Sequence, residues 1–220
     1  MITLSVDAST YRGTVAVLDG ERLLYESAVG MRGRDSELLM PAVSDALGQS
    51  GRDIAQVRRV ICGAGPGSFT SLRIAASIAK GIAVGRDVPL YAVSSLALIV
   101  AGNVSDGPRG VRRYLAALDA LRGESYVAEF EHEAGVVRPA GAMRLVPTDD
   151  VAALAESTGA RPVGPDQRDH WLPHARGVAL LHGVIDQEGA VDLAGWEPLY
   201  GRMAEAQVKW EATNGRPLPR

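Results

Sequence analysis

The segment at residues 72–84 predicts a helix with almost no polar face, and this feature most limits how the chain can fold. Isoleucines and alanines at four-residue spacing form two adjacent ridges of that helix: Ile74, Ile78, Ile82, Ala75, Ala79 and Ala83. Only Arg73, Ser77 and Lys80 interrupt the apolar surface. A helix that is apolar nearly all round must be covered on more than one side. A sheet would cover one side. Deeper burial or another chain would cover the other, and the small-residue ridge favours an interface with a second helix.

The segments around this helix alternate between strand and helix patterns. Strands are predicted at residues 2–6, 14–18 and 22–27, with Asp19-Gly20 as the second hairpin turn. Then follow a helix from Asp35 or Ser36 to residue 49, a buried strand at 57–62, a strand at 88–93 and a helix to residue 101 capped by Ser94 or Ser95. A meander followed by alternating helices and strands predicts an α/β fold, with mixed sheets covered by helices on both faces.

A loop-rich break at residues 103–110 separates a second part of the chain. Here the patterns predict strands at 114–118 and 125–130, a helix capped by Thr148 that ends near residue 157, and a short strand at 161–163. We therefore predict an N-terminal subdomain over residues 1–103, a smaller C-terminal subdomain over residues 111–213 and a disordered tail over residues 214–220.

The composition argues against several classes of protein. The formal net charge is −3, so no basic field would draw the chain onto nucleic acid or an anionic membrane. The single cysteine, Cys62, excludes an internal disulfide framework and fits a reducing compartment. The N-terminus lacks the pattern of a signal peptide, and no apolar run approaches the ~20 residues of a membrane span. These features predict a soluble cytoplasmic protein.

The glycine-rich loop before the helix, AGPGSFTSLR at residues 64–73, resembles a phosphate-binding loop only in outline. A Walker loop needs a lysine after its last glycine, and a dinucleotide-binding loop needs a third glycine where Ser68 stands. A nucleophile elbow needs the order G-x-S-x-G. The loop matches none of these. Two interpretations stay open: a tight turn in which Ser68 or Thr70 caps the helix, or an exposed helix start that holds an anion or a partner's carboxylate.

Asp7, Ser9 and Thr10 follow the first predicted strand and form a candidate nucleotide site. Actin-like phosphotransferases hold metal and phosphate with an aspartate and small hydroxyl residues at such a bend. The alternative is a turn in which these side chains bond to their own backbone.

Two further clusters are weaker candidates. His170 and His174 have the spacing of zinc ligands on a helix, but Pro173 disrupts the helix that this spacing presumes, so we expect no metal there. A polar cluster lies between two predicted strands, either as catalytic groups or as a solvated turn: Asp119, Arg122 and Glu124.

Together these residues resemble the TsaB (YeaZ) family of bacterial tRNA threonylcarbamoyladenosine (t6A) biosynthesis proteins. The strongest match is GPGSFTSLRI at residues 65–74, which is similar to the family's G-P-G-S-F-T-G-L-R-I. VDAST at residues 6–10 resembles I-D-T-S-T, SELLMP at residues 36–41 resembles S-x-x-L-L-P, and DALRGESY at residues 119–126 resembles D-A-R-M-G-E-V-Y. PLYGR at residues 198–202 is similar to a closing P-x-Y-L-R.

The resemblance implies an actin-like (ASKHA, ribonuclease-H-like) fold in two subdomains. It also implies a non-catalytic scaffold that binds and activates the catalytic paralogue TsaD in t6A synthesis, with a TsaE-type ATPase as third component. Contact with tRNA would be indirect, the chain would need no cofactor, metal or membrane, and it would form a homodimer when alone. The competing hypotheses are a small actin-like ATP-dependent phosphotransferase and a metallopeptidase-like hydrolase.

The predicted partner interface combines residues of two helices and of the loop between strand and helix: Leu39, Val43, Ser68, Phe69, Thr70, Leu72, Arg73, Ala76 and Lys80. Within the second helix, we expect Ala76 to face the partner and Ile78 to face the sheet.

Overall fold

The structure is a computed structural model that describes residues 1–31, 37–105, 110–200, 213 and 215. In these residues the strands form two mixed sheets. The first has the order β3-β2-β1-β4-β5 and is built from β1 (Ile2–Asp7), β2 (Arg12–Asp19), β3 (Arg22–Gly30), β4 (Val57–Gly63) and β5 (Leu90–Val93). The first three strands pair antiparallel, and β4 and then β5 extend the sheet in parallel from β1.

The second sheet repeats this plan in shorter form. It has the order β10-β6-β7-β8, with β9 also paired to β7, and consists of β6 (Arg112–Asp119), β7 (Glu124–Glu133), β8 (Val136–Pro139), β9 (Arg144–Pro147) and β10 (Arg161–Val163). The antiparallel pair β6–β7 matches β1–β2, and β10 joins β6 in parallel as β4 joins β1. The predicted fold class, an actin-like α/β fold with mixed sheets, is confirmed.

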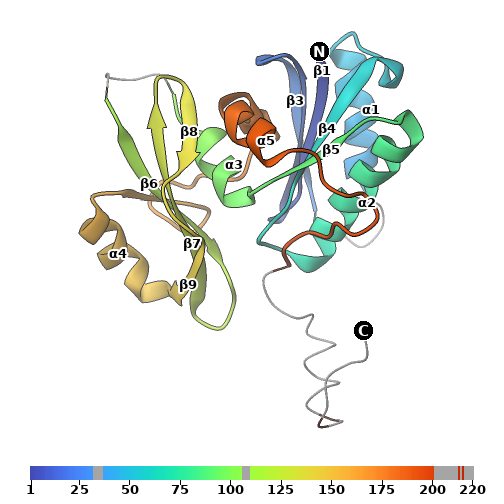
Figure 1. The fold of residues 1–220 in the computed structure, drawn as a ribbon. Coiled ribbons are helices and arrows are strands. Elements are labelled where there is room, and N and C mark those ends of the chain that lie inside the picture. The colour runs from blue at the N-terminus through green and yellow to red at the C-terminus, as the bar shows by residue number, and fades with distance from the viewer. Residues whose placement is uncertain (32–36, 106–109, 201–212, 214, 216–220) are drawn as a thin grey trace.

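Helices lie outside and between the sheets, as Figure 1 shows. Helices α1 (Leu39–Gln49) and α2 (Phe69–Arg86) cover the outer face of the first sheet, and α4 (Val151–Thr158) covers the outer face of the second. Helices α3 (Ser95–Ala101) and α5 (His182–Glu188) lie between the sheets. Short 3-10 turns occupy Ile54–Gln56, Thr148–Asp150 and Ala175–Leu180.

One apolar core joins the two sheets. It contains Leu18 of the first sheet and Phe130 of the second, together with nearly all of α3. Val178 and Ile185, from the last part of the chain, complete the same core. The described chain therefore has no open apolar gap between its sheets at this point.

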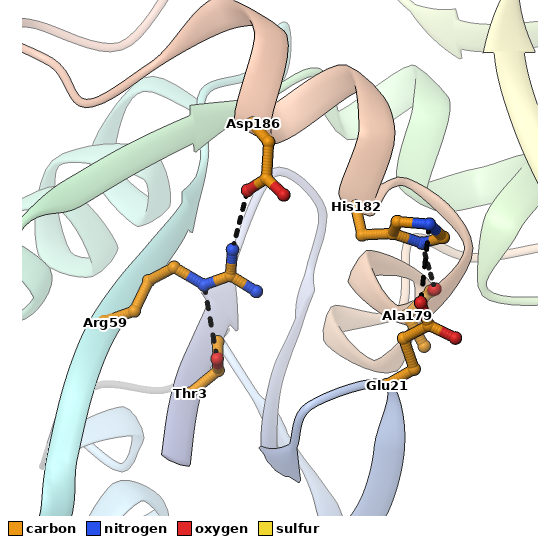
Figure 2. Close-up of polar contacts among 6 residues, drawn as sticks. All are labelled: Thr3, Glu21, Arg59, Ala179, His182 and Asp186. Atoms are coloured by element: carbon orange, nitrogen blue, oxygen red, sulfur yellow. Dashed lines mark hydrogen bonds and ion pairs between the residues drawn. The ribbon is translucent and has the colours of Figure 1, made fainter. Parts of the chain in front are cut away.

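Helix α5 is fastened to the first sheet by polar contacts, which Figure 2 shows. The Arg59 guanidinium donates to Thr3 Oγ1 over 3.2 Å and pairs with the Asp186 carboxylate at 3.0 Å. His182 Nε2 lies 3.4 Å from a Glu21 carboxylate oxygen. The return of the chain to the first sheet thus has specific contacts beyond its apolar packing.

The predicted division of the chain into residues 1–103 and 111–213 stays a prediction about folding units. The structure shows that residues 175–200 leave the second sheet and pack against elements of the first. The amide of Ala175 donates to Thr14 Oγ1 over 3.0 Å, and the amide of Val191 donates to the carbonyl of Leu90 over 2.8 Å. The predicted tail lies outside the described residues except for Gly215.

Most predicted elements are present, but several expected caps are replaced. The expected caps of α1, Asp35 and Ser36, lie outside the described residues; the Glu37 carboxylate accepts the amides of Leu39 and Met40. Pro41 lies in the first turn of α1, where no intrahelical amide bond is lost.

Two further caps differ from expectation. Thr148 begins a 3-10 turn before α4, and its hydroxyl bonds Ser125 at 2.9 Å, so its assignment as the helix cap is wrong. Ser94 occupies the cap position of α3 without a capping side-chain bond among the described residues, because its neighbour Ser95 is turned towards Asp7.

Candidate functional site

The glycine-rich loop between β4 and α2 is closed by packing against three parts of the chain. A Cβ on Gly63 would lie 1.9 Å from Asp7 Oδ2, and one on Gly67 would lie 2.1 Å from the Ser9 carbonyl. At Gly65, where φ is +86°, a Cβ would lie 2.4 Å from the carbonyl of Leu199. Each of these contacts leaves no room for a side chain, which explains why glycine recurs at every second position.

The amides of this loop are used within the protein. Ala64 donates to the carbonyl of Val93 over 2.7 Å, Gly65 to Ser95 Oγ over 3.0 Å, and Ser68 to the carbonyl of Ser9 over 2.7 Å. A phosphate-binding loop offers such amides to its ligand. These amides are unavailable to an anion while the loop keeps this conformation.

Asp7 lies at the centre of this packing. It is fully buried, and its Oδ1 accepts the Ser9 amide at 3.0 Å and the Ser9 hydroxyl at 2.8 Å. Its Oδ2 accepts the Ser95 hydroxyl at 2.6 Å. Burial raises the pKa of the Asp7 carboxyl, and the hydrogen bonds from Ser95 and Ser9 offset only part of that shift. Burial, together with the nearby Asp7, also raises the pKa of the Cys62 thiol.

The three residues proposed as nucleotide ligands are therefore held in local hydrogen bonds. Thr10 Oγ1 exchanges bonds of 3.2 Å with the backbone of Arg12, as a turn residue does. Asp7, Ser9 and Thr10 as a nucleotide site stay a prediction, and their observed bonds are those of the alternative, a structural turn.

The two apolar ridges of α2 face in different directions. Ala75, Ala79 and Ala83 are fully buried against the first sheet, so the ridge that was expected to accept another helix packs inside the chain. Ile74 and Ile78 are half-buried and face a groove. The expected orientation of α2 is reversed, because small residues let the helix approach its own sheet closely and leave the isoleucines at the rim.

This groove, called the α2 groove here, has a volume of about 500 Å³ and is lined by Glu37, Phe69, Thr70, Arg73, Ile74, Ser77 and Ile78. Arg73 lies over the ring of Phe69, with its guanidinium carbon 5.3 Å from the centroid. The ring of Tyr200 also packs against Phe69, and the two ring centroids lie 4.6 Å apart. An apolar floor with charged groups at the edge suits another polypeptide better than a nucleotide.

The last described segment, residues 191–200, crosses α2 and is called the C-terminal strap here. Lys80 Nζ lies 5.7 Å from the ring centroid of Trp196, and the amide of Leu199 donates to the carbonyl of Ala64 over 2.7 Å. The strap therefore connects α2 and the glycine-rich loop, and it ends at Tyr200 beside the α2 groove.

The predicted interface residues divide into two groups. Ser68, Thr70 and Arg73 are exposed, and Phe69 and Lys80 are half-buried, so these side chains are accessible from outside. The other four are closed off in the chain's own core: Leu39, Val43, Leu72 and Ala76.

The assignment of these four to a partner surface is corrected, because a partner could reach them only by opening that core. Ser68 occupies the cap position of α2, but its hydroxyl lies 3.1 Å from the Ser71 hydroxyl, with no capping bond among the described residues. Sequence reasoning missed Glu37 and Tyr200 as groove residues, since contacts between distant segments leave no periodic signal. Ser77 was visible as a polar break in the helix and is the more useful marker of its open face.

A polar hollow of about 190 Å³ lies at the end of the second sheet, lined by Ala117, Leu118, Asp119, Ser125, Thr148, Asp166 and Gln167. Asp119 Oδ1 accepts the amide of Leu121 at 2.7 Å, so this carboxylate supports the turn between β6 and β7. Of the cluster that sequence reasoning grouped there, Arg122 and Glu124 do not line the hollow.

Within the described residues, no group of three or more histidine, cysteine, aspartate or glutamate side chains is arranged to hold a metal ion. His170 and His174 belong to no such group there. The same residues contain no helix with the length and hydrophobicity needed to cross a membrane.

Comparisons with known proteins agree with this geometry. A family model described as TsaD, tRNA N6-adenosine threonylcarbamoyltransferase, matches residues 33–168, which is more than half of the chain. YeaZ from Pseudomonas aeruginosa has a TM-score of 0.73 and 28% sequence identity, over 90% of this chain and 99% of that one. Fold and site thus define an actin-like protein whose glycine-rich loop is filled and whose outer helix is grooved.

The curated relatives narrow this class. The Bacillus subtilis tRNA threonylcarbamoyladenosine biosynthesis protein TsaB is 28% identical over 96% of this chain and 98% of its own length. The Escherichia coli protein of the same name is 33% identical over 60% of this chain, and the match spans little more than half, 56%, of its length. The chain belongs to the TsaB (YeaZ) family.

Proposed function

We propose that this protein is a non-catalytic subunit of the machinery that makes t6A in tRNA, and that it binds and activates a TsaD-type catalytic paralogue. Membership of the TsaB (YeaZ) family supports a role in t6A biosynthesis. The partner docks on the α2 groove and its rim, which Phe69, Arg73 and Ser77 line. A TsaE-type ATPase is the third component, and the complex acts on tRNA in the cytoplasm, with tRNA contacting this subunit only indirectly.

The single observation that supports this proposal is the contrast between the loop and the helix. The amides and carboxylate that a phosphotransferase would turn to its substrate are bonded to the protein itself, at Asp7, Gly65 and Ser68. The outer face of α2, by contrast, offers an apolar floor with Ile74 and Ile78 half-exposed. Covering apolar area removes it from water at about 25 cal/mol per Å², which favours association.

The same reasoning gives the behaviour of the chain without its partner. Identical grooves on two copies can pair about a twofold axis, because such an interface uses the same patch on both chains. The free protein is therefore a homodimer in this proposal, and the paralogue replaces the second copy. Light scattering at tens of micromolar that reports a monomer would count against this part.

The central test is capture of the TsaD-type paralogue of the same organism by the full chain. Ser77→Glu places a charge in the α2 groove, where an apolar partner surface would have to bury it without a counter-charge, so binding should be lost. Ser157→Glu is the matched control, because Ser157 is an exposed serine on α4 at the far side of the molecule. Equal capture by both variants would remove the groove from the proposal, and absence of capture by the unchanged chain would remove the partner.

A further inference from the structure

The α2 groove begins where the described part of the chain ends. Tyr200 packs its ring on Phe69, which is both the first residue of α2 and part of the groove lining. Burial raises the pKa of the Tyr200 phenol, and the nearby Arg73 partly counters that rise, which places Tyr200 close to the groove's cationic edge. Leu199 is fixed by its bond to Ala64. Residue 201 therefore starts at the N-terminal end of the groove.

The 20 residues that follow Tyr200 have the composition of a groove ligand. Met203, Ala206 and Trp210 are spaced by three and four residues, a pattern that puts them on one face of a helix. Residues 203–213 as a helix would span about 16 Å, whereas the 18 residues of α2 span about 27 Å. The segment is thus long enough to reach along the groove and short enough to fit within it.

The charges of the segment and the groove also match. The groove has an apolar floor of Ile74 and Ile78, with Arg73 and Glu37 among its lining residues. The segment has acids at Glu205 and Glu211 and a base at Lys209, between or beside its apolar residues. A segment with both signs can meet both groove charges while its apolar face covers the floor.

We propose that residues 201–213 of the same chain bind in the α2 groove and cover the partner surface until the catalytic subunit displaces them. This regulation rests on the function proposed above, since it concerns the same groove. Tethering favours this occupant over a free one, because the strap holds the segment at the groove at high effective concentration. The partner then binds only the fraction of molecules whose groove is open, and its apparent affinity falls by that fraction.

The direct test follows Trp210 in the full chain by fluorine NMR after incorporation of 5-fluorotryptophan. The chain has three tryptophans, and Trp210→Phe identifies the signal of interest. We expect this signal to lie away from its position in a free peptide of residues 201–213 and to move towards it in Ile78→Ala. Val84→Ala is the matched control, because Val84 is an exposed residue of α2 that does not line the groove.

Dilution separates the possible occupants. A contact within one chain keeps the Trp210 signal unchanged on tenfold dilution, and this is the expected result. A signal that moves towards the free peptide on dilution would assign the groove to a second copy and overturn the proposal. A signal at the free-peptide position at every concentration would overturn it as well.

A second measurement compares partner binding by the full chain and by Met203→Ser/Trp210→Ser. If the groove is covered about nine-tenths of the time, this variant should bind the TsaD-type paralogue about tenfold more tightly. Lys209→Ala, which leaves the apolar face intact, should bind within twofold of the full chain. Loss of partner binding by every variant would contradict the proposed function and leave the fluorine result standing. Equal tight binding by all variants, with Trp210 at its free position, would contradict only the present inference.

Discussion

The hydroxyl of Ser95 donates to Oδ2 of Asp7 across 2.6 Å, and so joins the first residue of α3 to the last residue of β1. The same oxygen of Ser95 accepts the amide of Gly65 at 3.0 Å. A strand end, a helix start and the glycine-rich loop therefore meet at one buried carboxyl. This arrangement turns a site that resembles a catalytic aspartate into a structural junction.

Asp7→Asn should leave the chain folded and at least as stable at pH 7. Burial raises the pKa of Asp7, so the folded state binds the proton more tightly than the unfolded state. The stability linked to this group is full below the ordinary pKa of about 3.9 and is lost as pH rises through the higher folded value. Asparagine has no such titration. Chemical denaturation between pH 4 and 7 should show a smaller decline for the Asp7→Asn variant than for the natural chain.

Asp7→Ala is the companion variant. It removes the acceptor of the Ser9 and Ser95 donors, and each buried group left without a partner costs about 1–3 kcal/mol. A thermal melt equal to that of the natural chain would show that the junction contributes nothing.

Gly63→Ala should destabilise the protein strongly. The added Cβ would lie 1.9 Å from Asp7 Oδ2, and neither the buried carboxyl nor the β4 backbone has space to move. Gly48→Ala in α1 is the control, since nothing lies within 4 Å of its added Cβ. Replacing that helical glycine should raise stability by about 0.5–1 kcal/mol. Urea titrations of the two variants should move in opposite directions, and similar midpoints would contradict the described packing.

Ala76→Glu and Ser77→Glu should separate folding from association although they are neighbours. Ala76 is 5% exposed, so a glutamate there buries a charge without a partner and should cost several kcal/mol, on the order of 3–5. Ser77 is exposed in the α2 groove and should tolerate the same change within about 0.5 kcal/mol. Circular dichroism melts of both variants measure this; an Ala76→Glu chain with an unchanged midpoint would mean that α2 does not lie as described.

The stability of the junction between the sheets should fall in mild acid because of His174. Burial, and then the Arg176 guanidinium, lower the pKa of its imidazole, while Glu26 partly opposes them. The folded state thus resists protonation. The stability linked to His174 is full above about pH 6.5 and is lost as pH falls through the lower folded value. His174→Gln should flatten the decline between pH 7 and 5, and an unchanged profile would assign the acid sensitivity to other groups.

The purified chain should not hydrolyse ATP in a metal-dependent way. The amides of Gly65 and Ser68 are bonded within the protein, and the loop has no lysine after Gly67. Phosphate release with magnesium or zinc present should equal that of a heat-treated sample. Turnover that disappears in Asp7→Ala, while the variant stays folded, would restore the phosphotransferase hypothesis.

The sequence alone predicted the local elements well because their signals are local. The Asp19-Gly20 turn, the strand at residues 57–62 and the apolar helix all follow from periodicity and turn residues within short windows. Strands β8 and β9 were missed because each has only four residues and is exposed along much of its length. Helix α5 was missed because its seven residues include a single buried side chain, Ile185.

The candidate site was harder to predict, because its geometry depends on which face of α2 meets the sheet. Periodicity distinguishes an alanine ridge from an isoleucine ridge but does not tell which packs inside. The decision comes from how closely helix and sheet approach, and the small side chains of Ala75 and Ala79 lie at that contact. Glu37 and Tyr200 reach the groove from distant parts of the chain, and only the folded structure brings them together.

The core that both sheets share sets an order on biosynthesis. Leu98 and Ile99 of α3 leave the ribosome long before Val178 and Ile185, which complete the same core. During that interval the inner face of the first sheet has no final covering, and a nascent chain would present it to chaperones or to other nascent chains. A ribosome stalled after about residue 170 should therefore hold a protease-sensitive chain, whereas release of the full sequence should close the molecule in one cooperative step.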